Sequence, residues 1–345
     1  MKNKKFTIGL TLLMAGSLFL TNCTKNKTNE APSPDYEVES TQEMNRIQMI
    51  VSDIHEMGAV AGDQFTNLFG WMSHTPLSIM QGTTTINSTN AVIFYDLIGK
   101  YYTITFNNTV GKDGHVRNGL LTFNYGATTT VSAVDYYRQP GFTASVTATG
   151  YSVDDYSVAI NNMLITNTTP IGFPVAPNTP TNVNMTWSQV SDVSISQAVG
   201  TTTVTNTWNG TINKTLLNTR IGTMVPMPIA SPQTFTVYPT PFGSSLNWAK
   251  AWISYSGQGS GNLHYTGPYS LTMSGVTRNM NSSPEVFYSS AGMFVSPERH
   301  PFLSGFMSFK PGSKPTRDVD FGAGENVDYN VKVTIEGVTY DVDCK

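Results

Sequence analysis

Charged residues are scarce in this chain of 345 residues, of which only 12% are Asp, Glu, Lys or Arg, against about a quarter in a typical domain. Thr, Asn, Ser and Gly take their place, and no acidic residue occurs from Val193 to Pro284. A solvated helix normally carries charges along its exposed face, whereas an exposed sheet face accepts Thr readily. The composition therefore favours β-structure.

An excess of basic residues is also missing. The formal net charge is −3, and it includes Lys2, Lys4 and Lys5 of a segment that we expect to be removed. The remaining chain has 17 basic and 23 acidic residues. Nucleic-acid binding requires a basic face, so the composition argues against that class of partner.

Cysteine is limited to Cys23 and Cys344, so a framework of disulfides within one chain is excluded. Cys344, near the end of the chain, is interpreted as an incidental thiol. A disulfide between the two cysteines is an alternative only where Cys23 carries no lipid.

Motifs for catalysis are missing as well. Gly257–Gly261 (Gly-Gln-Gly-Ser-Gly) has the wrong spacing for a nucleophile elbow and is interpreted as a flexible turn. His55-Glu56 opens the zinc helix motif, but Ala59 stands at the second histidine position. The histidines show no spacing typical of metal ligands and are interpreted as turn or surface residues: His55, His74, His115, His264 and His300.

Carboxylates give no catalytic pair either. Asp154 and Asp155 are adjacent, so on a strand they point to opposite faces and cannot flank one glycosidic bond. We therefore predict no catalytic centre and no cofactor. A hydrolase built from carboxylates distant in sequence stays open as an alternative.

A long apolar run is absent except at the start. Residues 1–22 are typical of a secretory signal, with lysines followed by 15 residues from Phe6 to Leu20, short of the ~20 that span a membrane. Leu20-Thr-Asn-Cys23 resembles the lipobox of bacterial lipoproteins, which implies cleavage before Cys23 and lipid attachment to it. Plain secretion is the alternative. Residues 23–36 are polar and Pro-containing, as expected of a flexible tether.

One short helix is expected after the tether, within residues 37–70. Ser40-Thr-Gln-Glu43 has the pattern of a capping box. Apolar residues then recur at helical spacing up to Met57, and Gly58 is expected to end the helix. The prediction is a helix from about Thr41 to Met57.

Strand patterns fill the remainder, residues 71–345. Short alternating runs are separated by Gly, Pro and Asn, and no helical pattern lies between them. The predicted fold is all-β, a large antiparallel β-sandwich or an elongated meander. The Pro-rich segments 167–182 and 226–243 are interpreted as loops within one β body, with a two-domain division as the alternative.

The end of the chain gives the sharpest prediction. Val331–Ile335 and Val338–Val342 alternate in polarity around Glu336-Gly337, which predicts a hairpin with a two-residue turn. In this register Ile335 faces Val338, and Lys332 pairs with Asp341. One face of the hairpin is apolar and requires a larger sheet to cover it.

Two groups of residues are candidate binding sites. Aromatic side chains amid Asn and Thr suit sugar stacking if exposed, although core packing is the common role of such residues; they are Trp187, Trp208, Trp248, Trp252, Tyr255, Tyr265 and Tyr269. The acidic cluster Asp318, Asp320, Glu325 and Asp328 is a weak Ca²⁺ candidate, because its spacing is not that of an EF-hand. Solvated carboxylates around a glycine turn are the simpler interpretation.

Four stretches together resemble uncharacterised secreted lipoproteins of Bacteroidota-type bacteria: Leu20–Cys23, Asp113–Gly119 (Asp-Gly-His-Val-Arg-Asn-Gly), Tyr136–Tyr156 and Asp320–Gly324 with the hairpin that follows. The resemblance implies a lipid-anchored β protein of the outer membrane, on its periplasmic or surface side, and implies no activity.

The predicted function is non-catalytic binding or scaffolding in the cell envelope, with the membrane and a glycan or another envelope protein as partners. A glycan-binding surface lipoprotein and a hydrolase are the alternatives.

Overall fold

The computed structural model describes residues 38–69, 81–86, 91–96, 99–110, 115–125, 141–169, 186–217, 252–278, 287–289, 292–294, 302, 304–322 and 330–343. The signal segment, Cys23, the tether and Cys344 lie outside these residues.

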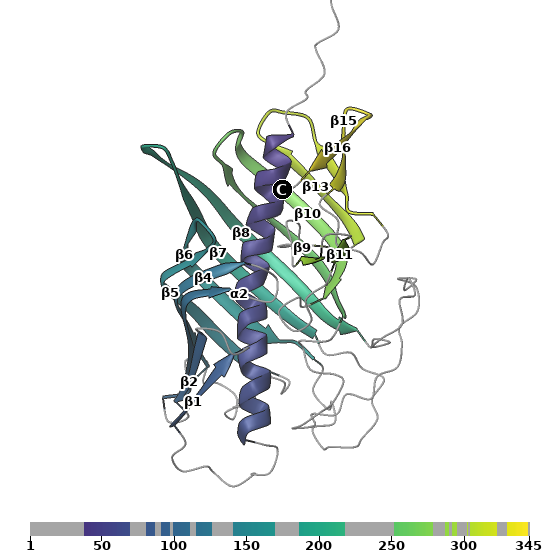
Figure 1. Cartoon of the computed structure of the whole chain (residues 1–345). Helices are drawn as coiled ribbons and strands as arrows, with labels where there is room; N and C mark the ends of the chain where they lie inside the picture. Colours follow the sequence, from purple (N-terminus) through teal and green to yellow (C-terminus); the bar gives the residue numbers. More distant parts are fainter. Residues whose placement is uncertain are drawn as a thin grey trace, which may run out of the picture. The chain divides into compact units, whose positions relative to one another are not determined.

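One antiparallel sheet of 14 strands dominates the described chain (Figure 1). Each of its strands pairs with the next along the chain, β10 pairing with β13. The strands are β1 (Gln81–Ile86), β2 (Ala91–Asp96), β3 (Tyr101–Val110), β4 (Val116–Asn124), β5 (Thr143–Val153), β6 (Tyr156–Asn167), β7 (Thr186–Val199), β8 (Thr202–Leu217), β9 (Trp252–Leu263), β10 (Gly267–Arg278), β13 (Ser304–Pro311), β14 (Arg317–Asp320), β15 (Asn330–Ile335) and β16 (Val338–Asp343). A separate pair joins β11 (Phe287–Ser289) to β12 (Gly292–Phe294).

The predicted all-β antiparallel fold is confirmed, in its meander form. Both Pro-rich segments connect strands that are neighbours in the sheet, because β6 pairs with β7 and β8 pairs with β9. The sheet thus continues across each of them. In the terminal hairpin, every predicted pair forms, including Ile335 with Val338 and Lys332 with Asp341. Its turn has positive φ at both Glu336 and Gly337, as a two-residue hairpin turn requires.

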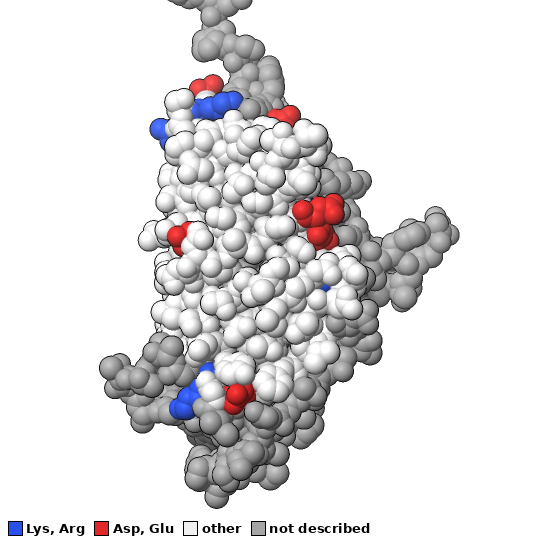
Figure 2. Space-filling view, turned by 90° about the vertical axis from the view of Figure 1, so that its left-hand side faces the viewer, with Lys and Arg blue, Asp and Glu red and all other residues white. Residues whose placement is uncertain are grey.

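The outer face of the sheet is covered by small polar side chains. Along β8 the residues that alternate with the buried ones are Thr203, Thr205, Thr207, Asn209, Thr211, Asn213 and Thr215. Figure 2 shows one side of the molecule almost without charge, with its few charged residues scattered. The Thr and Asn residues that replace charged residues in the composition therefore lie on the exposed face of the sheet, as predicted.

The helix α2 (Glu39–Phe69) has 31 residues, so it begins before and ends well after the predicted range. Ser40 is buried inside the first turn, and the predicted capping box at Ser40 is therefore wrong. Gly58 does not end the helix. A Cβ at this position would lie 2.3 Å from Phe123 Cε1, so glycine is needed for close approach of the helix to β4.

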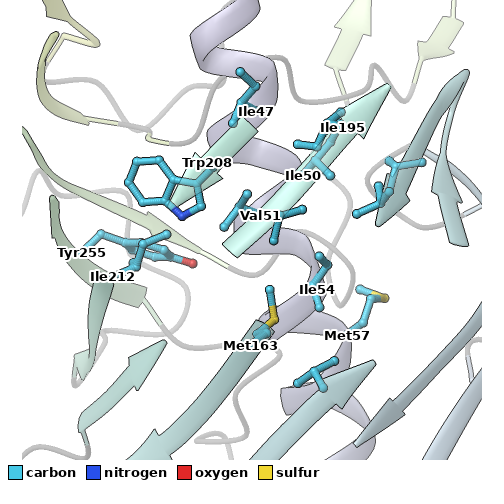
Figure 3. Close-up of a cluster of buried hydrophobic side chains, with 14 of the residues drawn as sticks. Ile47, Ile50, Val51, Ile54, Met57, Met163, Ile195, Trp208, Ile212 and Tyr255 are labelled. Atoms are coloured by element: carbon cyan, nitrogen blue, oxygen red, sulfur yellow. The ribbon is translucent and has the colours of Figure 1, made fainter. Parts of the chain in front are cut away.

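The sheet curves around α2. Asp53 contacts β4 and Glu56 contacts β9, although these residues are only about 4.5 Å apart along the helix axis. The two strands are five steps apart in the sheet, or about 24 Å if it were flat. Buried side chains of both partners fill the space between them, among them Ile50, Ile54 and Ile195 (Figure 3).

Glycines in β9 allow it to approach β8 closely, both at the Trp208 side chain and at the Thr207 backbone. A Cβ at Gly259 would lie 2.5 Å from Trp208 Cη2, and one at Gly261 would lie 1.9 Å from the Thr207 carbonyl oxygen. The segment Gly257–Gly261 is therefore the middle of a strand, and the predicted flexible turn is wrong. Small residues on β9 accommodate a large one on β8.

Candidate binding site

The structure contradicts the predicted sugar-stacking role for Trp187 and Trp208. Trp187 and Trp208 are 1% and 0% exposed, and the indole Nε1 of Trp208 donates to Ser191 Oγ at 3.0 Å. Both belong to the core, since their strands turn these positions inward, and neither can stack on a sugar. Trp248 and the side chain of Trp252 lie outside the described residues.

The three tyrosines of the same group differ in burial. Tyr255 and Tyr269 are buried in the core, whereas Tyr265 is 60% exposed. Tyr265 lies in the turn between β9 and β10, with its ring edge-on to His264 at 5.0 Å. Of this group, Tyr265 alone is shown to be exposed.

The acidic cluster is only partly described. Asp318 and Asp320 share one face of β14, as predicted. Their oxygens bond locally, since Asp318 accepts from Ser308 Oγ at 2.6 Å and Asp320 accepts from the Gly322 amide at 2.8 Å. Glu325 and Asp328 lie outside the described residues. Within the residues that the structure describes, no group of three or more His, Cys, Asp or Glu side chains gathers to hold a metal.

Two of the histidines are buried, against the prediction of turn or surface positions. His55 is 0% exposed within α2, and His115 is 3% exposed. His115 Nδ1 lies 2.8 Å from Asp154 Oδ2, while Asp154 Oδ1 accepts from the Val116 amide. This contact closes the start of β4 against the β5–β6 turn. His264 is exposed, and His74 and His300 lie outside the described chain.

A buried ion pair holds α2 to the sheet. Arg117 donates through Nε to Asp53 Oδ2 at 3.0 Å and through a second nitrogen to Oδ1. Tyr151 donates its hydroxyl to the same carboxylate at 2.8 Å. Because both aspartate oxygens are engaged, the charge is compensated where water has no access. Arg117 and Tyr151 lie in two of the stretches that carry the lipoprotein resemblance.

A second ionic group lies one helical turn further along. The Tyr255 hydroxyl donates to Glu56 Oε1 at 2.6 Å, and Lys214 Nζ lies 4.8 Å from the Tyr255 ring centroid. Burial lowers the pKa of Lys214 to about 7, and Glu56 and Asp53 oppose this shift. Burial also lowers the pKa of His55, with the Lys214 charge adding to the effect. Lys214, His55 and Tyr255 are buried, and Glu56 is half-buried, so the charges of this group bear on stability.

A pocket of about 220 Å³ lies at the first turns of α2. Its buried lining residues are Ile47, Ile195 and Asn206, and its exposed ones are Glu39, Val199 and Tyr265. The helix, β6, β7, β8 and the β9–β10 turn all contribute to the lining. The volume is below the ~300–1,000 Å³ of sites for drug-sized ligands, so it fits a small molecule.

The polar groups of this pocket come largely from the helix. Burial raises the pKa of Glu43, while a hydrogen bond with Asn206 and electrostatic interactions with His264 and Arg46 partly oppose the rise. Arg46 donates to the Tyr156 hydroxyl and lies 4.8 Å from that ring centroid. The pocket thus combines a carboxylate, a guanidinium group and amides within one small space.

Sequence reasoning missed most of this site. The sequence pattern places Glu43 in a helix cap and indicates no role for Arg46, Tyr156 or Asn206. A signal did exist for the helix, because Glu39, Glu43 and Arg46 follow the i, i+4 and i+3 spacing of one face. The partners on β6 to β8 are more than 100 positions away in sequence, and no local pattern identifies them.

Comparison with known proteins gives no relative, since no family model, no curated protein and no solved structure matches the chain. The resemblance to envelope lipoproteins therefore stays a prediction. Within the described part of the chain, no helix has both the length and the apolar character needed to cross a membrane. What the structure defines is an antiparallel meander around a helix, with a small polar pocket at the first turns of that helix.

Proposed function

We propose that this protein is a non-catalytic, lipid-anchored binding protein of the cell envelope, and that its ligand site is the pocket beside Glu43. The observation that carries the binding role is the pocket itself, where buried Asn206 and half-buried Glu43 and Arg46 converge from the helix and β8. Convergent polar groups in a small concave site are typical of ligand recognition. The signal segment and the lipobox-like Leu20–Cys23 support the envelope address.

The binding role is tested with a library of small polar metabolites and thermal denaturation. A ligand that binds only the folded state stabilises it, by about 2.7 kcal/mol at a concentration of 100 Kd. We expect hits for the wild type and none for Gln197→Trp, in which an indole fills the pocket. Ser256→Trp on the outer face is the matched control and keeps the hits. An absence of hits, or equal hits in both variants, would contradict the binding role.

The envelope address has its own test. Mass spectrometry of the N-terminal peptide from native membranes is expected to show lipid on Cys23, and Cys23→Ser is expected to release the protein from the membrane fraction. An unmodified thiol on a secreted form would overturn this part of the proposal. Protease accessibility on whole cells then distinguishes the surface side from the periplasmic side.

Hydrolysis is the second candidate function, because Glu39 and Glu43 both line the pocket and the pKa of Glu43 is raised by burial. The two residues lie one turn apart on the same helix, so their carboxylates occupy one wall of the pocket. Glycosidases place their carboxylates on both sides of the scissile bond, and this difference favours binding. Fluorogenic aryl glycosides test for hydrolysis. Turnover by the wild type that Glu43→Gln abolishes would establish a hydrolase in place of a binding protein.

A further inference from the structure

The pocket chemistry restricts the class of ligand. Glu43 offers only acceptors when ionised, Arg46 offers only donors, and the amides of Asn206 and Gln197 offer both. Arg46 already donates to the Tyr156 hydroxyl, and Asn206 already accepts from the His264 amide. A polar ligand can use the donor and acceptor positions that remain on the four side chains, whereas an apolar ligand can use none. A hydroxyl can donate and accept, so a ligand with several neighbouring hydroxyls satisfies all of them.

Charge narrows the class further. Glu39 and Glu43 both line the pocket, whereas Arg46 is the one Lys or Arg among the described residues that line it, and it already donates to Tyr156. An anionic ligand would meet two carboxylates, with a guanidinium group that is partly occupied. The ligand is therefore uncharged or carries an amine.

Tyr265 adds an apolar surface at the mouth. It is 60% exposed, and its edge-on contact with His264 supports the ring from one side. An aromatic ring with a polar tip packs against apolar C–H groups and keeps its hydroxyl in water. A ligand that has one apolar face and a rim of hydroxyls matches Tyr265 together with the polar wall.

We propose that the ligand is a single hexopyranose unit, the terminal sugar of a glycan, which stacks on Tyr265 and hydrogen-bonds to Asn206, Gln197 and Glu43. This inference rests on the proposed binding function and names its ligand class. The volume of about 220 Å³ admits one such ring and not an extended chain within the pocket. The site replaces the tryptophan platform that the sequence suggested.

Ligand-observed NMR with a panel of methyl hexopyranosides, in neutral and 2-amino forms, tests this inference on the whole chain. We expect saturable binding by at least one glycoside. Tyr265→Ala is expected to weaken it about tenfold, because the stacking contact is lost. Phe306→Ala is the matched control, since Phe306 is 63% exposed on the outer face and its loss leaves the affinity unchanged.

The outcomes separate the two proposals. If polar metabolites stabilise the wild type but no glycoside binds, the sugar inference is wrong and the binding function stands. If glycosides bind and Tyr265→Ala has no more effect than Phe306→Ala, the site assignment is wrong. If neither the library nor the glycosides bind, the binding function itself fails. Glu43→Gln keeps the shape of the side chain and tests the contribution of the carboxylate charge. We expect this variant to lose any preference for amino sugars and to bind neutral and amino sugars with equal affinity.

Discussion

Lys214 is a buried lysine whose surroundings differ greatly from water. It is 0% exposed, and its Nζ lies 3.4 Å from the Ser52 carbonyl oxygen and over the Tyr255 ring. The nearby Glu56 carboxylate is bonded to the Tyr255 hydroxyl. The Lys214 charge is therefore only partly compensated by its neighbours. For this reason burial lowers the Lys214 pKa by more than the carboxylates raise it.

The Lys214 pKa gives a pH-dependent stability. The folded-state pKa is about 7 and the usual value is 10.5. Between these two pH values the unfolded chain binds a proton that the folded chain does not, so the free energy of unfolding rises with pH across this window. Lys214→Met removes this contribution. We expect the variant to be more stable than the wild type at neutral pH by a few kcal/mol, because each unit by which the pKa is lowered corresponds to about 1.4 kcal/mol, with a flatter pH profile in urea unfolding.

Lys310→Met is the control for that profile, because Lys310 is exposed on β13. Its curve is expected to follow the wild type between neutral pH and about pH 10. A Lys214→Met protein less stable than the wild type at neutral pH would mean that the lysine compensates Glu56 more than its own burial costs.

Single residues were the least predictable part of the molecule. The sequence shows Lys214, Asp53 and Arg117 as ordinary polar positions, and only the fold brings them into contact. Asp53 and Arg117 are 64 positions apart, and Glu56 and Tyr255 are 199 apart. Contacts at such separation leave no local pattern, whereas the alternation of β15 and β16 predicted the pairs from Val331–Val342 to Ile335–Val338 in the terminal hairpin.

At the scale of elements, the length of α2 is the instructive error. Glycine lowers helix propensity by about 1 kcal/mol relative to alanine, and this preference predicted an end at Gly58. The helix continues because Phe123 stacks on Tyr102 directly beneath that position, and Tyr102 donates to the Gly58 carbonyl oxygen at 3.1 Å. Tertiary contact thus overrides propensity where helix and sheet touch.

Gly58→Ala separates these two effects, because they have opposite signs. Propensity alone would stabilise the helix, whereas the added Cβ would lie 2.3 Å from the Phe123 ring. We expect a net destabilisation of about 1–3 kcal/mol, the usual cost of overpacking a core. Urea unfolding measures it. The double variant Gly58→Ala with Phe123→Leu is expected to recover part of the loss, and a stabilised single variant would contradict the close contact.

For the whole molecule, helix and sheet cannot bury their apolar surfaces separately. Residues 50–55 of α2 are all buried, including the polar Ser52, Asp53 and His55. An isolated helix would expose Ile50, Val51 and Ile54, and a sheet without the helix would expose Trp208 and its neighbours to water. The proposed ligand pocket depends on the same packing of helix against sheet, because residues of both line it.

This mutual burial predicts one cooperative unit. We expect the amides of α2 between Met44 and Met57 to exchange hydrogen only through global unfolding, with the same protection as the central strands β7 and β8. The physical reason is that opening the helix alone would expose apolar side chains of both helix and sheet to water, among them Ile50 and Trp208, and would break the Arg117–Asp53 pair. Hydrogen exchange followed by mass spectrometry measures both regions in one sample. An α2 that exchanges faster than β7 and β8 at low denaturant would show that the helix detaches on its own, and a pocket built on its first turns would then open and close with it.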